Sequence, residues 1–363
     1  MKKLTALFLA VLMVLGLAAC GGNAEESTTE VTTEATTEAT TEATTEATEA
    51  TEPTVTEQLR NPLTGEVEED GKLDRIFAFS IGNTSAALPH AGFSQADLVF
   101  EVYVNALTTR CFAMFSNLSE VEAVGSCRSL RYPFIDLTKA YDTITIYAGA
   151  SKTVLSALSK ANIETIHAEA SSEFSFRDNA RHNSGTAWEH CLFDRGADLV
   201  SYAENTKKYD VTMDTEKDYG MRFTENAAPA DGQDAQTITI HFQLSGADKK
   251  TIMTYNADLD RYVYSQYSSV MTDYNNDHPV SFKNVFVLMA KTHTDDHGYH
   301  ISDLVGTGEG YFACGGKMTA IQWTRETEED TFSFTLADGT PLEQGIGSSY
   351  IAIVPTGSAV DCE

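Results

Sequence analysis

Apolar residues are concentrated near the start of the chain, where residues 4–19 form an almost unbroken apolar and small stretch. Lys2 and Lys3 precede it. A positive start followed by a short apolar run is typical of a secretory signal peptide. The run is also shorter than the roughly 20 residues of a stable membrane span. We therefore predict a signal peptide over residues 1–19.

Residues 17–21 read Leu-Ala-Ala-Cys-Gly, which resembles the lipobox of bacterial lipoproteins. Small residues before the cut fit the signal peptidase, and the thiol of Cys20 would receive a diacylglycerol. Two or three acyl chains, palmitate among them, suffice for stable anchoring because each buried methylene contributes about 0.8 kcal/mol. We predict a membrane anchor at Cys20. The alternative is an ordinary signal peptide followed by a chance cysteine.

Polar residues follow the anchor. Between residues 23 and 57 the chain has ten glutamates and no lysine or arginine, and Thr-Thr-Glu-Ala repeats fill residues 32–47. Such a segment cannot bury an apolar face that would offset its chain entropy, and its like charges keep it extended. We predict that residues 20–58 are the lipidated cysteine and a disordered linker, either a plain spacer or an O-glycosylated stalk.

After the linker, residues 59–206 alternate short apolar runs with helical patterns. The predicted strands are residues 75–81, 96–104, 109–115, 143–148 and 164–167. The predicted helices are residues 133–141, 151–160 and 186–204, the last with Gly196 as a candidate break. This alternation predicts a mixed α/β domain.

The texture changes after a polar linker over residues 207–235. The predicted strands of the second half are residues 237–242, 251–255, 261–267, 284–290, 311–314, 318–323, 331–335 and 349–354. Turn signals separate them, and no helix of normal length fits between them. Residues 236–363 are therefore predicted to be a mostly antiparallel β domain, which makes the fold class α+β overall.

The charge of the chain limits its partners. It has 53 acidic and 25 basic residues, a formal net charge of −28. Nucleic acids require a cationic protein surface, and anionic lipids attract basic segments. We therefore expect no nucleic-acid partner, and contact with the membrane only through the N-terminal lipid. An anionic ligand would need a local basic pocket.

Five cysteines follow Cys20. They are Cys111, Cys127, Cys191, Cys314 and Cys362. Their spacing matches no zinc pattern, and an odd number cannot pair completely within one chain. Cys111 and Cys127 could form a disulfide between adjacent strands; the alternative is that the cysteines are small buried residues.

A set of motifs along the chain resembles a known family. The motifs are residues 60–65 (Arg-Asn-Pro-Leu-Thr-Gly), 92–102, 109–110, 124–131, 134–136, 147–149, 176–178, 181–183, 282–288, 306–308 and 339–342. In this order and spacing they resemble the YerB-like lipoproteins, whose paired N- and C-terminal domains have no assigned function. The resemblance implies that architecture and a place on the extracytoplasmic face of the cell membrane. It supplies neither an activity nor a cofactor, and we expect no cofactor.

Two motifs depart from the family pattern. Residues 125–128 read Gly-Ser-Cys-Arg where Gly-Pro-Val-Arg is expected, and residues 181–185 read Arg-His-Asn-Ser-Gly where Pro-His-Asn-Leu-Tyr is expected. Because the family does not need a thiol at this position, the first departure argues against Cys127 as a nucleophile.

Arginines dominate the candidate site. The candidate ligand-binding residues are Arg110, Arg128, Arg131, Arg177, His182, Asn183, Glu101 and Asp136. Guanidinium groups match carboxylates and phosphates bidentately, so four arginines in so acidic a protein predict an anion site for a phosphorylated or carboxylated envelope precursor or wall fragment. The alternative is that each arginine pairs with a buried acid. Glu101 lies in an apolar strand and faces either water or a partner, for which an arginine is the natural choice.

The favoured function is therefore a non-enzymatic binding or assembly protein of the cell envelope, with an anionic ligand or an envelope protein as partner. The alternative is an envelope hydrolase or transferase that uses the arginines with Glu101 or His182 as base, and a purely structural scaffold is a third reading.

A histidine-rich stretch near residue 297 is a candidate metal site. His293, His297, His300, Asp295 and Asp296 are close in sequence. They fall in a predicted hairpin loop, where the helical spacing of zinc ligands does not apply. We predict no metal site there.

Overall fold

The computed structural model describes residues 58–69, 71–105, 108–243, 248–295 and 298–363. The predicted signal peptide, Cys20 and the Thr/Glu linker lie outside these residues. All described residues belong to one compact unit.

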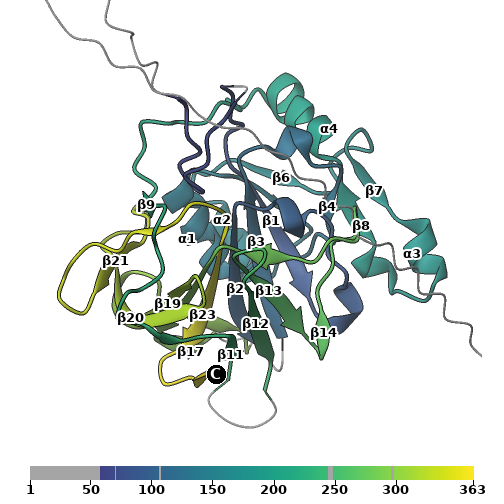
Figure 1. Ribbon diagram of the computed structural model, residues 1–363. Helices are drawn as coiled ribbons and strands as arrows, with labels where there is room; N and C mark the ends of the chain where they lie inside the picture. The colour runs from purple at the N-terminus through teal and green to yellow at the C-terminus, as the bar shows by residue number, and fades with distance from the viewer. Residues whose placement is uncertain (1–57, 70, 106–107, 244–247, 296–297) are drawn as a thin grey trace, which may run out of the picture. The chain divides into compact units, whose positions relative to one another are not determined.

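A large mixed sheet runs through the centre of this unit (Figure 1). Its strands, in spatial order, are β10 (Gln233–Asp234), β20 (Lys317–Arg325), β19 (Gly306–Cys314), β16 (Asn284–Ala290), β23 (Ser349–Pro355), β2 (Leu98–Asn105), β3 (Thr108–Phe115), β1 (Phe77–Asn83), β5 (Ile144–Tyr147) and β6 (Thr165–His167), with β21 (Ser333–Leu336) paired to β20. Strand β2 pairs in parallel with β23, with Glu101 opposite Ala352. The two halves of the sequence thus contribute strands to one continuous sheet.

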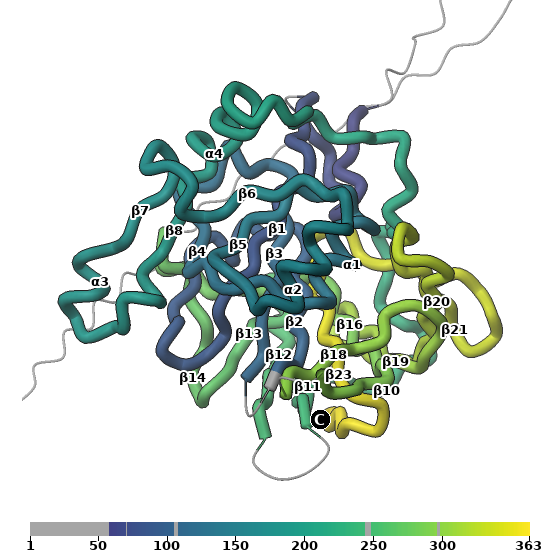
Figure 2. The backbone as a smooth tube through the Cα atoms, turned by 180° about the vertical axis from the view of Figure 1, so that it is seen from behind, coloured from purple at the N-terminus to yellow at the C-terminus, as the bar shows by residue number. Residues whose placement is uncertain are grey.

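The two faces of the main sheet are covered differently. A second, antiparallel sheet packs on one face, with strands β14 (Ser269–Val270), β13 (Arg261–Gln266), β12 (Lys250–Asn256), β11 (Thr237–His241) and β24 (Val360–Cys362), and with β15 (Ser281–Phe282) paired to β13. Helices α1 (Tyr132–Tyr141) and α2 (Lys152–Leu158) pack on the other face. Figures 1 and 2 show the molecule from these two sides.

Alternation along the central strands divides their side chains between the two cores. In β2, Val99 and Tyr103 join the core under the second sheet, whereas Phe100 and Val102 join the core under the helices. Because both faces are covered, the central strands read as nearly continuous apolar runs. This burial explains why the sequence pattern located them well.

Helix α1 confirms the predicted helix over 133–141, and its proline lies in the first turn, where the missing N–H costs no hydrogen bond. Helix α2 confirms most of the helix predicted over 151–160. Its N-cap is Ser151, whose hydroxyl accepts a hydrogen bond from the Val154 N–H at 3.3 Å.

The helix predicted over 186–204 is wrong in its first half. The chain there forms a 3₁₀ turn at Trp188–His190 and a buried strand, β8 (Leu192–Asp194), before helix α4 (Gly196–Tyr202) begins. Strand β8 pairs with β4 (Val124–Gly125) and β7 (Ser175–Arg177) in a small sheet. These tertiary pairings override the local helical pattern.

Three smaller features complete the fold. Helix α3 (Asn179–Asn183) follows β7 directly. Strands β17 (Thr292–Thr294) and β18 (His300–Ser302) pair antiparallel, so His293 and His300 lie on strands and not in the loop predicted there. Strands β9 (Phe223–Thr224) and β22 (Gln344–Gly345) form a parallel pair. The described part of the chain is thus rich in sheet and contains few, short helices.

Candidate functional site

Arg110 and Arg128 lie side by side on the helix-covered face of the main sheet. Arg110 of β3 lies directly opposite Gly82 of β1. Opposite residues point to the same face of a sheet, so a side chain at Gly82 would lie on the same face as that of Arg110. A Cβ at Gly82 would come within 2.7 Å of the Arg128 Cγ. The missing side chain at Gly82 therefore lets Arg128 lie across β1 beside Arg110.

Arg131 joins these two from the start of helix α1, where it is the N-cap residue. Its guanidinium carbon lies 5.0 Å from the ring centre of Tyr299, which immediately precedes β18. Its Nη1 donates a hydrogen bond to the carbonyl oxygen of Leu130 at 3.1 Å. We call Arg110, Arg128 and Arg131 the arginine cluster.

The electrostatics of the arginine cluster indicate that its charges are close together. Burial, and then the positive charges of Arg131 and Arg128, lower the pKa of Arg110 well below its usual value. Burial also lowers the pKa of Arg131, and Arg128 adds to this effect. Like charges in a partly dehydrated site disfavour the charged form of each group, whereas a nearby opposite charge favours it.

Several donors of the cluster have no partner among the described residues. The Nε and Nη1 atoms of Arg110 and the Nε atom of Arg131 are buried and make no hydrogen bond there. Arg128 does have partners: its Nη1 donates to the carbonyl oxygen of Glu189 at 2.8 Å, and its Nη2 lies 3.5 Å from the exposed carboxylate of that residue. Within the described residues, no carboxylate forms an ion pair with Arg110 or Arg131.

His190 is a neighbour of the cluster that the sequence did not suggest. Its side chain is buried, and its Nδ1 has no hydrogen-bond partner among the described residues. Burial lowers the pKa of His190, and the charge of Arg128 lowers it further. The sequence offers one signal for His190, namely its place directly after Glu189 in the turn at Trp188–His190. The backbone carbonyl of Glu189 is the one that Arg128 binds.

Arg177 and His182 are grouped around a different residue, Trp188. Arg177 pairs with Glu169 at 2.6 Å and donates from Nη1 to the Trp188 carbonyl oxygen at 2.7 Å. The Nδ1 of His182 lies 2.9 Å from the Thr186 carbonyl oxygen, and its ring packs edge-on against Trp188. Asn183 is exposed at the end of α3. The structure therefore does not bring these three residues into the arginine cluster.

Asp136 lies further along α1, next to Arg325. Burial raises the pKa of Asp136 to about 6, although the charge of Arg325 opposes the shift. The Nη2 of Arg325 donates to the backbone carbonyl oxygen of Asp136 at 2.8 Å. Asp136 is thus associated with Arg325 and not with the cluster.

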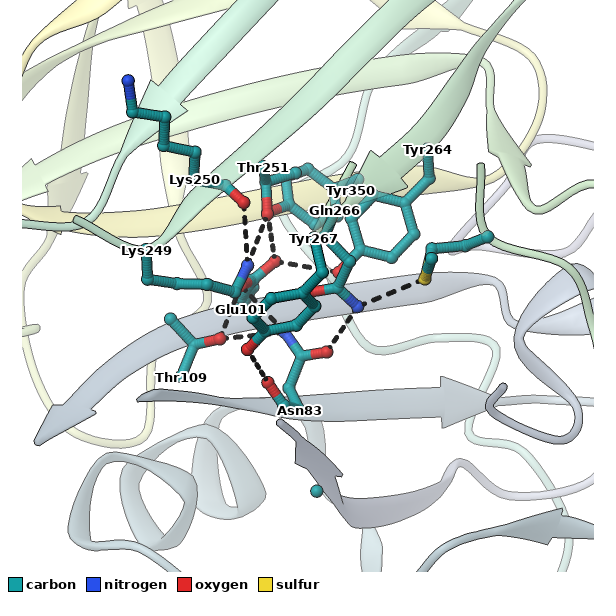
Figure 3. A network of polar contacts seen from close by, with 12 residues as sticks. Asn83, Glu101, Thr109, Lys249, Lys250, Thr251, Tyr264, Gln266, Tyr267 and Tyr350 are labelled. Atoms are coloured by element: carbon teal, nitrogen blue, oxygen red, sulfur yellow. Dashed lines mark hydrogen bonds and ion pairs between the residues drawn. The ribbon is translucent and has the colours of Figure 1, made fainter. Parts of the chain in front are cut away.

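Glu101 lies on the other face of the main sheet, where its carboxylate is completely buried (Figure 3). One carboxylate oxygen accepts from Asn83 Nδ2 (2.9 Å), Thr109 Oγ1 (2.6 Å) and Lys249 Nζ (3.0 Å). The other accepts from Thr251 Oγ1 (2.9 Å), Tyr264 OH (3.1 Å) and Tyr350 OH (2.7 Å). Both oxygens are therefore fully occupied.

The prediction that an arginine pairs with Glu101 is wrong, because the cation that pairs with Glu101 is Lys249. Strand alternation explains the error: Glu101 and Arg110 point to opposite faces of the sheet. Burial alone would raise the pKa of Glu101, but the charge of Lys249 and the hydrogen bonds outweigh it, so the pKa is lowered. A carboxylate held ionised and without a vacant lone pair is a poor general base.

The cysteines and histidines weighed from the sequence form neither a disulfide nor a metal site among the described residues. All five described cysteines are free. Burial raises the pKa of Cys127 well above its usual value, and its thiol donates to Asp194 at 3.1 Å. No group of three metal-ligating side chains occurs in the described ranges. His297 and Asp296 lie outside them.

Comparison with known proteins assigns the family. Residues 63–210 match the profile "Protein of unknown function (DUF3048) N-terminal domain", and residues 238–351 match the corresponding C-terminal domain. The chain belongs to the DUF3048 family. This confirms the resemblance to the YerB-like proteins.

One curated protein and one solved structure are similar to this chain. The chain is 26% identical over 315 residues to "Putative lipoprotein YerB" of Bacillus subtilis (strain 168), covering 84% of this chain and 88% of that protein. The crystal structure of YerB from Bacillus subtilis superposes with a TM-score of 0.72 at 22% identity, over 84% of this chain and 100% of that chain. The second comparison establishes the fold and nothing more.

The helices of the described residues bear on whether this part of the chain spans a membrane. None of their helices is long and apolar enough to cross a membrane. The predicted anchor at Cys20 lies outside the described residues and stays a prediction.

Proposed function

We propose that this DUF3048 protein is a lipoprotein of the cell envelope, tethered through Cys20 to the extracytoplasmic face of the membrane, that binds an anionic ligand at the arginine cluster. The name of its Bacillus relative and the Leu-Ala-Ala-Cys-Gly sequence at residues 17–21 support the anchor. Replacing Cys20 by Ser is expected to move the protein from the membrane fraction to the soluble fraction.

The buried donors without partners are the observation that carries the binding proposal. Three guanidinium N–H groups of Arg110 and Arg131 are withdrawn from water and point at no described acceptor. Leaving such a group unpaired costs about 1–3 kcal/mol, and more when it is charged. A phosphate or carboxylate would accept bidentate, charge-assisted hydrogen bonds from the same groups, which accounts for arginines that the fold itself does not pair.

The strongly negative net charge of the chain restricts where an anion can bind. In a protein with a formal charge of −28, most of the surface repels anions, and binding is favoured only where cations are concentrated. A phosphorylated or carboxylated envelope precursor or wall fragment meets this requirement.

Binding is better supported than catalysis. The hydrolase or transferase alternative needs Glu101 or His182 as a base beside the arginines. Glu101 faces the opposite side of the sheet with both oxygens occupied, and His182 packs on Trp188. The cluster therefore has anion donors, and neither Glu101 nor His182 lies beside it as a base.

Thermal unfolding tests the proposal. The full-length chain in detergent micelles would be melted with phosphate, nucleotide-sugar precursors, muropeptides and teichoic-acid fragments. A ligand at a hundredfold excess over its Kd stabilises the folded state by about 2.7 kcal/mol. We expect one anion class to raise the melting temperature of the wild type but not that of the double variant Arg128→Ala/Arg131→Ala.

The matched control is Arg222→Ala, which removes an exposed arginine paired with Asp218. It should keep the full ligand response. If the double variant responds like the wild type, or if no anion shifts either protein, the proposed site is wrong.

A further inference from the structure

A pocket lies at the end of strand β2, on the face of the main sheet opposite the arginine cluster. Its volume is about 620 Å³, within the range of about 300–1,000 Å³ of small-molecule sites. Residues far apart in sequence converge on it. Those used below are Tyr103, Gln243, Lys291, Thr292, His300 and Thr356.

One wall of the pocket is aromatic. The ring centres of Tyr103 and His300 are 4.5 Å apart with an interplanar angle of 36°. Gln243 Nε2 donates to the Tyr103 hydroxyl at 2.9 Å and fixes its position. Burial lowers the pKa of His300, so near neutral pH its imidazole offers one donor and one acceptor.

The rest of the lining combines the apolar ring of Pro355 with mostly uncharged polar residues. Thr292, Thr356, Gln243 and Lys291 line the pocket, and no aspartate or glutamate among the described residues does. This is unusual for a chain with 53 acidic residues. A single lysine gives little reason to prefer an anion, in contrast to the three arginines of the cluster.

We propose that this pocket binds a short, neutral saccharide. Sugar hydroxyls both donate and accept hydrogen bonds, as threonine hydroxyls, amides and a neutral imidazole do. The C–H face of a pyranose ring is apolar and packs on aromatic side chains such as the Tyr103–His300 wall. A lipid chain would leave most of these polar groups unpaired, at a cost in affinity.

The proposed saccharide site is independent of the proposed anion site, because the two use different residues. Tyr299 contacts Arg131, whereas the next residue, His300, lines the pocket, as expected for neighbouring positions of an extended chain. The two sites are thus on opposite sides of one hairpin, and each can be removed by mutation without touching the other.

The test is a titration with chitotriose and maltotriose, followed by calorimetry and saturation-transfer NMR. The full-length chain would be held in a polyoxyethylene detergent, because maltoside detergents carry a competing sugar. We expect saturable binding of at least one saccharide to the wild type. His300→Ala should weaken it by at least roughly tenfold, which is about 1.4 kcal/mol.

Two further variants keep the test decisive. Thr292→Val removes one lining hydroxyl with little change of shape, so it serves if His300→Ala does not fold. His293→Ala changes the exposed neighbour that pairs with Asp303 on the same hairpin, and should bind normally. Arg110→Met should also bind the saccharide normally, which separates this site from the arginine cluster.

Three results would overturn the proposal. One is the absence of saturable binding of either saccharide. Another is binding that neither His300→Ala nor Thr292→Val reduces. The third is displacement of the saccharide by inorganic phosphate in the Arg110→Met protein, which would show that the pocket is itself an anion site.

Discussion

Glu101 and Arg110 lie on neighbouring strands, and their environments are opposite. Glu101 accepts six hydrogen bonds from side chains around it, whereas two donors of Arg110 have no described acceptor. A buried charged donor without an acceptor destabilises the folded state, whereas a carboxylate with satisfied hydrogen bonds does not. The contrast suggests that Glu101 serves the structure and that Arg110 serves a ligand.

Arg110→Met tests this distinction through stability. Burial of Arg110 and its repulsion by Arg128 and Arg131 destabilise the folded state. Replacing Arg110 should therefore leave the free energy of unfolding unchanged or raise it by about 1 kcal/mol. Denaturant unfolding without added anions measures this. An arginine that staples the fold would instead show a loss of several kcal/mol.

At the scale of elements, the pairing of short strands explains what the sequence pattern missed. Strands such as 284–290 and helix 133–141 were located because their apolar spacing is local information. Strand β8 was predicted to be helix because its partners, β4 and β7, are about 20 to 70 residues away in sequence. The three arginines were named from their motifs, but Lys249, His190 and Tyr299 were not, because only tertiary packing brings them to Glu101 or to the cluster.

Asp194, at the end of β8, gives this small sheet a pH dependence. Burial raises the pKa of Asp194 to about 7. Because the folded state then holds its proton more tightly than the unfolded state, this contribution to stability is complete below the unfolded pKa, near 4, and is lost as the pH rises through about 7.

Asp194→Asn should therefore gain stability relative to the wild type as the pH rises. Between pH 5 and pH 8 the difference in unfolding free energy should change by roughly 3 kcal/mol, at 1.36 kcal/mol per pKa unit. Urea unfolding of both proteins at the two pH values measures it. A difference that does not vary with pH would mean that Asp194 titrates normally.

At the scale of the whole molecule, the pair Glu101–Lys249 joins the two sequence halves. Glu101 lies in β2, Lys249 directly precedes β12, and Tyr350 of β23 binds the same carboxylate (Figure 3). Both members of the ion pair are essentially inaccessible to water. The parallel pairing of β2 with β23 runs beside them, so the buried pair lies where the two DUF3048 segments share one sheet.

Lys249→Met should destabilise the whole protein, because it leaves a buried carboxylate without a cation. The expected loss is roughly 3–5 kcal/mol. The double variant Glu101→Gln/Lys249→Met should recover most of it, and Lys317→Met, which breaks the exposed pair with Asp234, should cost less than about 1 kcal/mol. A single cooperative transition in every variant would show that the halves unfold together; a separate early transition in Lys249→Met would show that they do not.

The most direct test of anion binding is to locate the anion. Crystals of the protein soaked in tungstate, a phosphate analogue with a strong anomalous signal, would be compared with unsoaked crystals. We predict an anomalous peak within hydrogen-bonding distance, about 3 Å, of Nε and Nη1 of Arg110 and Nε of Arg131. An empty cluster in soaked crystals, or a protein carboxylate occupying those donors, would contradict it.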